Sequence, residues 1–217
     1  MKNIILFAVQ NAGKGTVAQA LKEKYNYDHI STGDLLRERR KIDDEIGRII
    51  AQTQDAGELT PPEVVYQVFE EKISHPECEN YILDGFPRNV EQAIKCDEML
   101  SKIGKDNYIV VNLTVDDEEV LRRVTDRRTC VNCSKIYSTS YEAMKPKVEG
   151  ICDDCGSEVI FRKDDGDIDA IKKRIKIYHE NAAGLINYYQ EKGVLFTIDS
   201  TQTKNAIIEV EKIINND

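Results

Sequence analysis

Two hydrophobic patterns alternate along the chain, and together they predict an α/β fold. Runs of strand length that are rich in apolar residues occur at residues 4–9, 27–30, 81–83, 108–115 and 194–199. Between these runs, apolar residues recur at helical spacing, for example at Ile168, Ile171, Ile175 and Tyr178. Five strands that alternate with helices predict a three-layer domain with a mostly parallel sheet and right-handed connections.

The segment from residue 31 to residue 74 carries helical patterns only. One apolar stripe is formed by Ile42, Ile46, Ile49 and Ile50. A further helix is predicted after Pro61 and Pro62, because proline suits a first helical turn. We therefore expect a small helical insertion between two strands, which is either a subdomain that clasps a substrate or a packed pair of helices.

The first predicted strand runs directly into a segment suited to binding phosphate. The turn and the start of the next helix are formed by Asn11, Ala12, Gly13, Lys14, Gly15 and Thr16. Loop N–H groups and the helix N-terminus would converge on an anion, and Lys14 would supply a charge for terminal phosphates. The alternative is a tight strand-to-helix turn with a surface lysine.

This segment matches the phosphate-loop pattern G-x-x-x-x-G-K-[ST] imperfectly. Ala8 replaces the first glycine, and Asn11 occupies a position that is often glycine. Asparagine tolerates a positive φ better than most residues, and alanine adds only one methyl group. We therefore expect the loop to close at some cost in strain.

A second candidate segment follows the third predicted strand. Asp84 stands at the carboxyl end of that strand, where α/β sheets bind ligands, and can hold Mg²⁺ through water. Gly85 and Pro87 would turn the chain so that Arg88 points at the same site. Gln92, in the next helix, either pairs with the hydrogen-bonding edge of an adenine or is an ordinary exposed glutamine.

Several other cations are placed to meet a phosphate. Ser31 or Thr32 can cap a helix along which Arg37 reaches back toward an anion, although a capped surface helix is the alternative. Arg123 and Arg127 are four residues apart in a predicted helix, so their guanidinium groups would share one face.

Two adjacent guanidinium groups repel each other unless an anion lies between them. The alternative for Arg123 and Arg127 is pairing with local acids such as Glu119 or Asp126. Arg174, in a later helix, is a further cation that we place near the expected phosphates.

Four of the six cysteines form two C-x-x-C pairs, Cys130/Cys133 and Cys152/Cys155. In a chain without a secretion signal, this arrangement predicts a closed, structural Zn²⁺ site with four thiolate ligands. Two disulfides or free thiols are the alternative, and redox chemistry fits a duplicated pair less well. Tyr137, between the two pairs, would lie over a nucleotide base or in the core of a small ribbon.

Composition excludes several classes of protein. The chain has 217 residues, 41% hydrophobic and 32% charged, as in soluble globular proteins. Its formal net charge of −9 argues against a broad nucleic-acid surface. No apolar run approaches the length of a membrane span. We therefore expect a cytoplasmic protein with no nucleic-acid or membrane partner.

Taken together and in this order, these motifs resemble the adenylate kinases, specifically the form with a long, zinc-bearing lid. The resemblance covers nearly the whole chain, and the Asp84-Gly85-Phe86-Pro87-Arg88 segment is its most specific signature. It implies a P-loop nucleoside monophosphate kinase fold that catalyses ATP + AMP ⇌ 2 ADP with Mg²⁺.

The resemblance also implies a role for individual residues. ATP would be held by residues 11–16 with Arg127, Ile136, Tyr137 and Gln202. AMP would be held by Thr32, Arg37, Glu58, Leu59, Thr60, Gly85, Phe86, Pro87, Arg88 and Gln92. The transferring phosphoryl group would be surrounded by Lys14, Asp84, Arg88, Arg123, Arg127, Arg162 and Arg174, of which Arg162 and Arg174 also face AMP.

Three structural units follow from the same resemblance. The core would comprise residues 1–30, 75–127 and 164–217, with an AMP-binding insert at 31–74 and a zinc-bearing lid at 128–163. A monomer is expected. Alternative functions are a nucleotide-binding sensor without turnover, a zinc ribbon for macromolecular contact, or a kinase that uses GTP as donor or another monophosphate as acceptor.

Overall fold

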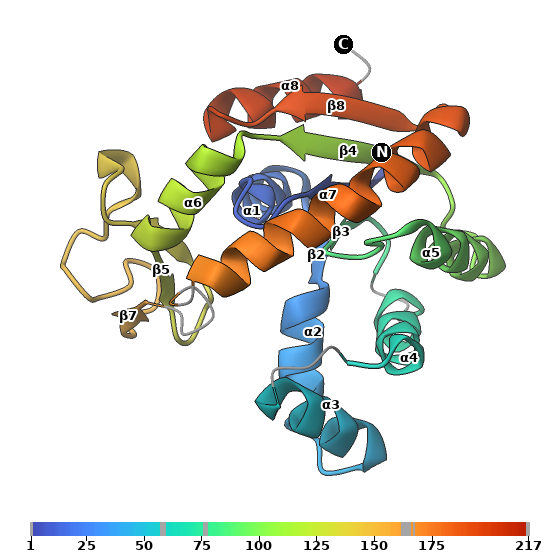
Figure 1. Cartoon of the computed structure of the whole chain (residues 1–217), viewed down its shortest axis with the longest axis horizontal. Coiled ribbons are helices and arrows are strands. Elements are labelled where there is room, and N and C mark those ends of the chain that lie inside the picture. The colour runs from blue at the N-terminus through green and yellow to red at the C-terminus, as the bar shows by residue number, and fades with distance from the viewer. Residues whose placement is uncertain (1, 57–59, 76–77, 162–165, 167, 216–217) are drawn as a thin grey trace.

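The computed structural model describes the chain except for residues 1, 57–59, 76–77, 162–165, 167 and 216–217 (Figure 1). Its centre is a five-stranded parallel sheet. In spatial order the strands are β2 (Asp28–Ser31), β3 (Tyr81–Asp84), β1 (Asn3–Ala8), β4 (Tyr108–Thr114) and β8 (Leu195–Asp199). The five predicted strands and their parallel arrangement are confirmed.

Helices cover both faces of this sheet (Figure 1). They are α1 (Lys14–Tyr25), α5 (Val90–Lys102), α6 (Asp117–Asp126), α7 (Ile168–Glu191) and α8 (Thr203–Asn215). α1 packs against α8, and α5 packs against α7. The result is the three-layer architecture that the hydrophobic pattern predicts.

Alternate residues of each central strand enter different cores, which explains why the strands read as unbroken apolar runs. In β1, Ile4 and Leu6 join the cluster that contains α1 and α8, whereas Ile5 and Phe7 join the cluster on the α5 side. Successive side chains of a strand point to opposite faces, so both faces of β1 must be apolar.

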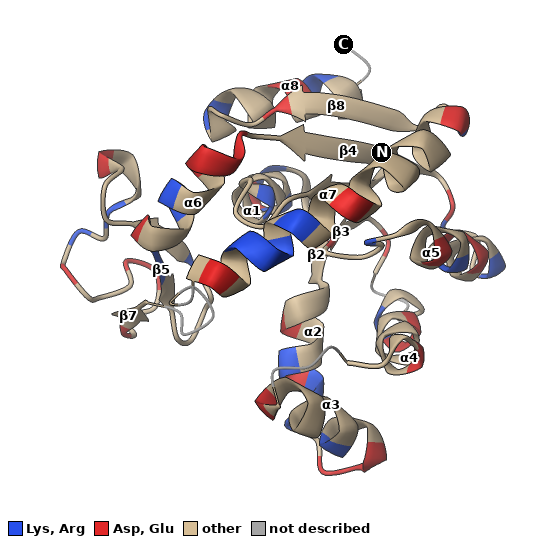
Figure 2. Ribbon diagram, in the orientation of Figure 1, with Lys and Arg blue, Asp and Glu red and all other residues tan. Residues whose placement is uncertain are grey.

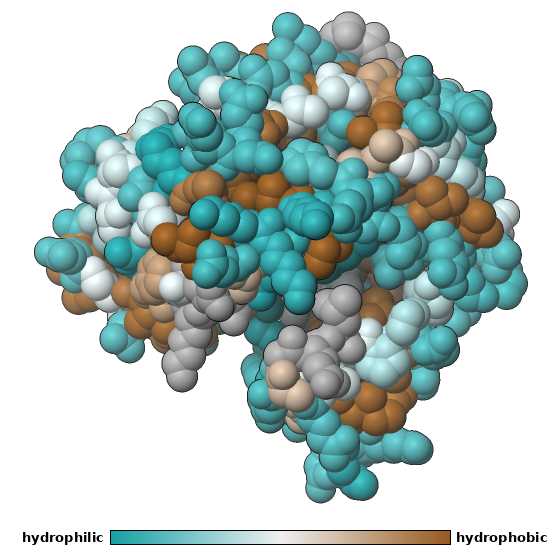
Figure 3. All heavy atoms as spheres, in the orientation of Figure 1, coloured by the Kyte–Doolittle hydropathy of each residue, from teal (hydrophilic) through white to brown (hydrophobic). Residues whose placement is uncertain are grey.

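Two parts of the chain project from this body (Figure 1). One contains α2 (Thr32–Arg39), α3 (Glu45–Asp55) and α4 (Pro62–Ile73). The other holds a small antiparallel sheet, in the order β6 (Ile136–Ser138), β5 (Arg127–Cys130) and β7 (Val159–Ile160), with a 3₁₀ turn at Glu142–Met144. Figure 3 shows an indented outline between the two projections.

The helical insertion has one boundary that the hydrophobic pattern misplaced. Ile42 lies before α3 and is 53% exposed, so it does not belong to the stripe of Ile46, Ile49 and Ile50. The helix starts later because Asp44 caps it, accepting a hydrogen bond of 2.8 Å from the Gly47 N–H.

Gly47 gives a direct test of the packing in this insertion. A Cβ atom at Gly47 would lie 1.9 Å from the Ile42 carbonyl oxygen, so the backbone would have to move. We expect Gly47→Ala to lower the free energy of unfolding by about 2 kcal/mol, despite the higher helix propensity of alanine. Urea unfolding measures this, with Gln52→Ala on the exposed side of α3 as the control. A stabilised Gly47→Ala protein would contradict the close approach.

Among the residues that the structure describes, none of the helices has the length and apolar character needed to cross a bilayer.

Candidate active site

The turn after β1 ends at Gly13, which adopts a left-handed backbone conformation just before α1. Gly13 has a φ of 94° and caps the helix, a conformation that favours glycine. A Cβ atom at Gly13 would lie 3.0 Å from the hydroxyl oxygen of Thr203, at the start of α8. The structure describes the whole first turn of α1, and this turn contains no acidic residue. The N-terminus of α1 therefore presents positive potential at the carboxyl edge of the sheet.

The Lys14 side chain folds back over this turn. Its Nζ donates hydrogen bonds of 3.1 Å to the carbonyl oxygens of both Ala8 and Val9. The last residues of β1 therefore fix the ammonium group beside the helix N-terminus. This placement argues against the alternative of a surface lysine in an ordinary turn.

Charges from different elements converge on Lys14. Burial lowers the pKa of Lys14, Asp84 opposes that shift, and Arg88 and Arg127 lower the pKa further. Burial raises the pKa of Asp84, but a hydrogen bond to His29 and the charges of Lys14 and Arg88 outweigh burial, so its pKa is lowered overall. The structure therefore brings the phosphate-loop lysine, the aspartate at the end of β3 and two arginines into one site.

Asn11 adopts the positive φ that the phosphate-loop pattern predicts at this position. Its φ is 63°, in the left-handed region. The side-chain nitrogen Nδ2 is buried and has no hydrogen-bond partner among the described residues. An unpaired buried amide is costly, so Asn11 combines two unfavourable features in the phosphate loop.

The turn after β3 points Arg88 back toward the sheet edge. Gly85 has a φ of 85°, and the peptide bond between Phe86 and Pro87 is cis. The Arg88 Nε donates a 2.7 Å hydrogen bond to the Gly85 carbonyl oxygen. Burial lowers the pKa of Arg88, Asp84 opposes this, and Arg174 lowers it further. Arg174 therefore belongs to the same electrostatic group.

Phe86 in this turn and Gln92 in α5 have structural contacts that the sequence did not indicate. The Gln92 side-chain oxygen accepts a 2.8 Å hydrogen bond from the Arg88 N–H. Phe86 is 2% exposed and packs 4.9 Å, between ring centroids, from Phe69 of α4. Only the backbone of Phe86 is therefore placed to meet a ligand.

The prediction that Arg123 and Arg127 share a helix face is wrong. α6 ends at Asp126, and Arg127 is the first residue of β5. Arg123 instead forms the acidic pair left open as the alternative, with its Nε 2.7 Å from Glu119 Oε1. The helix ends early because Thr139 donates a hydrogen bond of 3.0 Å to the Asp126 carbonyl oxygen, which starts the small sheet.

The remaining bonds of Arg123 join two loops. Its NH2 group donates to the carbonyl oxygens of Ser200 at 3.0 Å and Thr201 at 2.8 Å, and NH1 lies 3.5 Å from the Asn11 carbonyl oxygen. Arg123 thus lies between the phosphate loop and the loop before α8. Gln202, in that second loop, accepts a 2.9 Å hydrogen bond from the Asn205 N–H.

The start of α2 adjoins Asp84. Ser31 caps the helix, and the Thr32 hydroxyl donates a 3.3 Å hydrogen bond to the Asp84 carbonyl oxygen. Arg37 forms an ion pair with Asp34 on the surface of the helix. Its guanidinium is therefore held by a local acid, as in the alternative of a capped surface helix.

The remaining predicted site residues have fewer described contacts with the group around Lys14, or lie outside the described residues. Thr60 Oγ1 lies 3.4 Å from Thr53 Oγ1 at the end of α3. Arg174 NH1 donates a 3.4 Å hydrogen bond to the Gln10 side chain, which links α7 to the phosphate loop. The N-terminal half of α7 carries several other basic residues (Figure 2). Glu58, Leu59 and Arg162 lie outside the described residues.

Two residues outside the predicted site residues support the site. His29, on β2, has its Nε2 3.4 Å from Asp84 Oδ2. Ser200 is fully buried, and its hydroxyl donates a 2.6 Å hydrogen bond to the Ala12 carbonyl oxygen in the phosphate loop. The pairing of His29 with Ile82 puts His29 and Asp84 on the same sheet face, but that register cannot be read from sequence.

The small sheet places its two predicted nucleotide residues in different environments. A Cβ atom at Gly15, in the first turn of α1, would lie 3.4 Å from the Ile136 side chain. Ile136 therefore faces the phosphate loop. Tyr137 is 2% exposed and packs with Cys130 and Cys152, so its side chain lies in the core of the small sheet rather than over a base.

The four predicted metal ligands form one cluster. The sulfur atoms of Cys130, Cys133, Cys152 and Cys155 all lie within 4.8 Å of one another. Cys130 and Cys155 are 3.4 Å apart, and Cys133 and Cys152 are 3.5 Å apart. Four thiolates at about 2.3 Å from a tetrahedral Zn²⁺ are separated by roughly 3.8 Å, so this donor set fits zinc.

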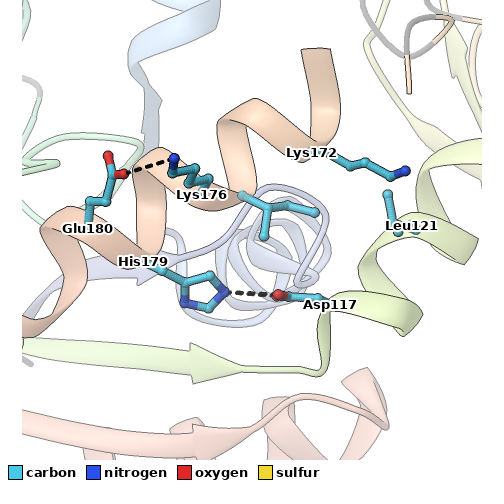
Figure 4. Close-up of a pocket in the computed structure, with 7 residues that line it drawn as sticks. Asp117, Leu121, Lys172, Lys176, His179 and Glu180 are labelled. Carbon is cyan, nitrogen blue, oxygen red and sulfur yellow. Dashed lines mark hydrogen bonds and ion pairs between the residues drawn. The ribbon is translucent and has the colours of Figure 1, made fainter. Parts of the chain in front are cut away.

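A groove of about 460 Å³ lies elsewhere, between α6 and α7 (Figure 4). Leu121 and Ile175 contribute its apolar lining, and His179 Nε2 forms a hydrogen bond of 2.9 Å with Asp117 Oδ1 across it. None of these residues belongs to the charged group around Lys14. The groove is therefore not part of the candidate active site.

Comparisons with known proteins show similarity to adenylate kinases over nearly the whole chain. A family model described as adenylate kinase matches residues 6–194. An adenylate kinase of Archaeoglobus fulgidus is 41% identical over 214 residues, which are 98% of this chain and 97% of the relative. One of Thermosipho africanus is 39% identical over 214 residues, 98% and 99% of the two chains. One of Lachnospira eligens is 41% identical over 205 residues, 94% and 95% of the two chains.

Proposed function

This chain belongs to the adenylate kinase family and is a nucleoside monophosphate kinase, and we propose that it transfers the terminal phosphoryl group of ATP to AMP, reversibly, to give two ADP. The observation that carries the proposal is the convergence of Lys14, Arg88 and Arg127 with Asp84 beside a helix N-terminus. A cluster of cations in a partly buried site suits a polyphosphate.

The donor nucleotide would lie on the side of the phosphate loop. The N–H groups of residues 11–16 bind its phosphates, and Lys14 and Arg127 neutralise their charge. Ile136 contacts the loop at Gly15, so its strand lies against the donor. The backbones at Tyr137 and Gln202 complete this side.

The acceptor would lie between α2 and the turn after β3. Thr32 and the backbone at 85–87 line this region, and Arg88 binds the acceptor phosphate. Arg37 would exchange its partner Asp34 for that phosphate, which costs little because the pair is exposed. Residues 58–60 and Gln92 would hold the base.

Phosphoryl transfer depends on in-line positioning and on neutralising charge, rather than on a protein base. Arg88, Arg127, Arg162 and Arg174 would surround the transferring group, and Arg123 would orient the loops behind it. Mg²⁺ bound with ATP would supply positive charge against the charge that develops on the phosphates. Asp84 is its protein anchor in this proposal, because its lowered pKa keeps it ionised.

Closure of the two projections over the core would exclude water during transfer. We assign residues 31–74 to acceptor binding and residues 128–163 to the lid, with residues 1–30, 75–127 and 164–217 as the core. Water is a competing acceptor for the phosphoryl group, so an enzyme that stayed open would hydrolyse ATP. The protein would act as a monomer, since each chain carries all the residues of the site.

The four-cysteine cluster would hold a structural Zn²⁺. These four thiolates would fill all the positions of a tetrahedral metal, so none would remain for a substrate. Zinc would therefore stiffen the lid and take no part in bond making.

A donor and acceptor panel tests the proposed activity. Purified protein is assayed for diphosphate formation with ATP or GTP as donor and with AMP, GMP, CMP or UMP as acceptor, with and without Mg²⁺. We expect the ATP and AMP pair to have the highest kcat/KM and to require Mg²⁺. A preference for GTP or another acceptor would change the substrate, and nucleotide binding without turnover would make the protein a sensor.

Asn11→Gly should raise kcat/KM for ATP. Glycine adopts the positive φ of this position without the strain that a Cβ atom causes. The substitution also removes a buried, unpaired amide beside the phosphates. Initial rates at varied ATP measure the effect, and Asn26→Gly serves as the control because Asn26 has a φ of 59° at the far end of α1. Unchanged kcat/KM would mean that the loop already accommodates Asn11 when ATP binds.

A further inference from the structure

Strand β6 has one residue facing the phosphate loop and the next facing the cysteine cluster. The Ile136 side chain lies against Gly15, at 3.4 Å from the position of a Cβ atom there. Tyr137 points the opposite way, as successive strand residues must, and packs with Cys130 and Cys152. The cysteine cluster and the phosphate loop therefore lie on the two sides of one three-residue strand.

The Tyr137 hydroxyl is fully engaged with the second cysteine pair. It donates a 3.3 Å hydrogen bond to Cys152 Sγ and accepts a 2.7 Å hydrogen bond from the Asp153 N–H. Its ring is 2% exposed, so these bonds are shielded from water. One phenol thus fixes both a sulfur atom of the cluster and the backbone that follows it.

Neighbouring contacts also hold the segment that follows Cys152. Lys135, which precedes β6, forms an ion pair with Asp154 and lies 5.7 Å from the centroid of the Tyr137 ring. Asp153 Oδ1 accepts a 2.9 Å hydrogen bond from the Lys147 N–H. Lys135 and Asp154 are exposed by 38% and 57%, whereas the Tyr137 hydroxyl is buried, so the phenol is the shielded link.

We propose that Tyr137 is a positioning residue of the metal site, whose hydroxyl orients the Cys152 thiolate toward the metal and joins that ligand to the strand that carries Ile136. This inference rests on the proposed zinc site. Groups that hydrogen-bond to metal ligands orient those ligands, and their loss typically reduces metal affinity by about 10- to 100-fold. The proposal also explains why the Tyr137 side chain is turned away from the nucleotide.

Tyr137→Phe removes the hydroxyl and keeps the ring that fills the lid core. The matched control is Tyr141→Phe, because Tyr141 lies in the same part of the chain but is 59% exposed. Zinc-loaded full-length proteins are mixed with a colorimetric chelator, and the rate of zinc transfer is followed. We expect Tyr137→Phe to release zinc about 10-fold faster or more, with Tyr141→Phe close to the unsubstituted protein.

A second readout reports the geometry of the ligands. Co²⁺ is substituted for zinc, and the thiolate-to-cobalt absorption bands are recorded for the three proteins. We expect those bands to shift in Tyr137→Phe alone. The far-ultraviolet circular dichroism, which reports secondary structure, should be unchanged. Equal release rates and identical cobalt spectra would overturn the role of Tyr137 and leave the metal site standing.

The same experiment separates this role from the metal site itself. If the unsubstituted protein took up neither Zn²⁺ nor Co²⁺, the proposed zinc site would be wrong and the role of Tyr137 would fall with it. If Tyr137→Phe released zinc faster and Tyr141→Phe did so equally, the effect would be general loosening of the lid and the proposal would also fail.

Discussion

Replacing Lys14 with methionine should lower kcat for the reaction of ATP with AMP by about 10³-fold, a loss of roughly 4 kcal/mol of transition-state stabilisation. The Lys14 ammonium is held by the carbonyl oxygens of Ala8 and Val9 at the N-terminus of α1, in the same site as Arg88 and Arg127. Methionine has a similar length but no charge. The phosphates would keep their loop N–H groups and lose the cation that neutralises the transferring group.

Lys22→Met is the matched control, because Lys22 is exposed in the last turn of the same helix. Steady-state rates at saturating ATP and AMP give kcat for both variants, and thermal melting confirms that each is folded. A Lys14→Met enzyme with kcat within tenfold of the unsubstituted enzyme, and folded equally well, would mean that Lys14 does not act on the phosphates.

Removal of the metal should lower the melting temperature by about 10 °C or more and change turnover at low temperature far less. Structural zinc sites contribute several kcal/mol to folding, and each kcal/mol moves Tm by roughly 2–4 °C in a chain of this size. The four sulfur atoms form a closed cluster in the small sheet, whereas the charged group around Lys14 lies at the sheet edge. Bound zinc would therefore affect the stability of the part of the chain that holds the small sheet, without contacting the reacting groups.

The experiment uses a thiol-selective reagent to release zinc, followed by calorimetry and by activity at low temperature. Cys78 and Cys96 are 1% and 0% exposed, so the reagent reaches the cluster first, where Cys133 and Cys155 are exposed. Reduction and addition of zinc should restore Tm. Loss of turnover at low temperature with an unchanged Tm would place the metal in the active site.

Local pattern was sufficient to predict the sheet, the turn before Lys14 and the clustering of the four cysteines. Strands buried on both faces must be apolar throughout, so β1 and β4 were recognisable without any knowledge of their partners. The loop before Lys14 and the two C-x-x-C pairs are likewise compact in sequence, and each chemistry needs residues at fixed short spacing.

The spacing of residues along the chain misled where a hydrogen bond that it does not register ended or started a helix. Arg127 follows Arg123 at helical spacing, yet a hydrogen bond from Thr139 to Asp126 ends the helix between them. Ile42 has the spacing of the α3 stripe, but the Asp44 cap starts the helix after it. Thr139 lies outside the window that periodicity samples around Asp126, whereas Asp44 lies within the stripe but is a polar cap that a count of apolar positions does not register.

By itself, the sequence determined the layers, the order of the elements, and the residue types available to bind phosphate and metal. These properties depend on burial periodicity and on short spacings, which any chain with this pattern must respect. Only the tertiary structure decided which face each side chain presents. In the tertiary structure Tyr137 points toward Cys152, Arg123 binds loop carbonyl oxygens and His29 lies beside Asp84. These orientations depend on strand register and loop packing between segments far apart in the chain, which the sequence pattern does not specify.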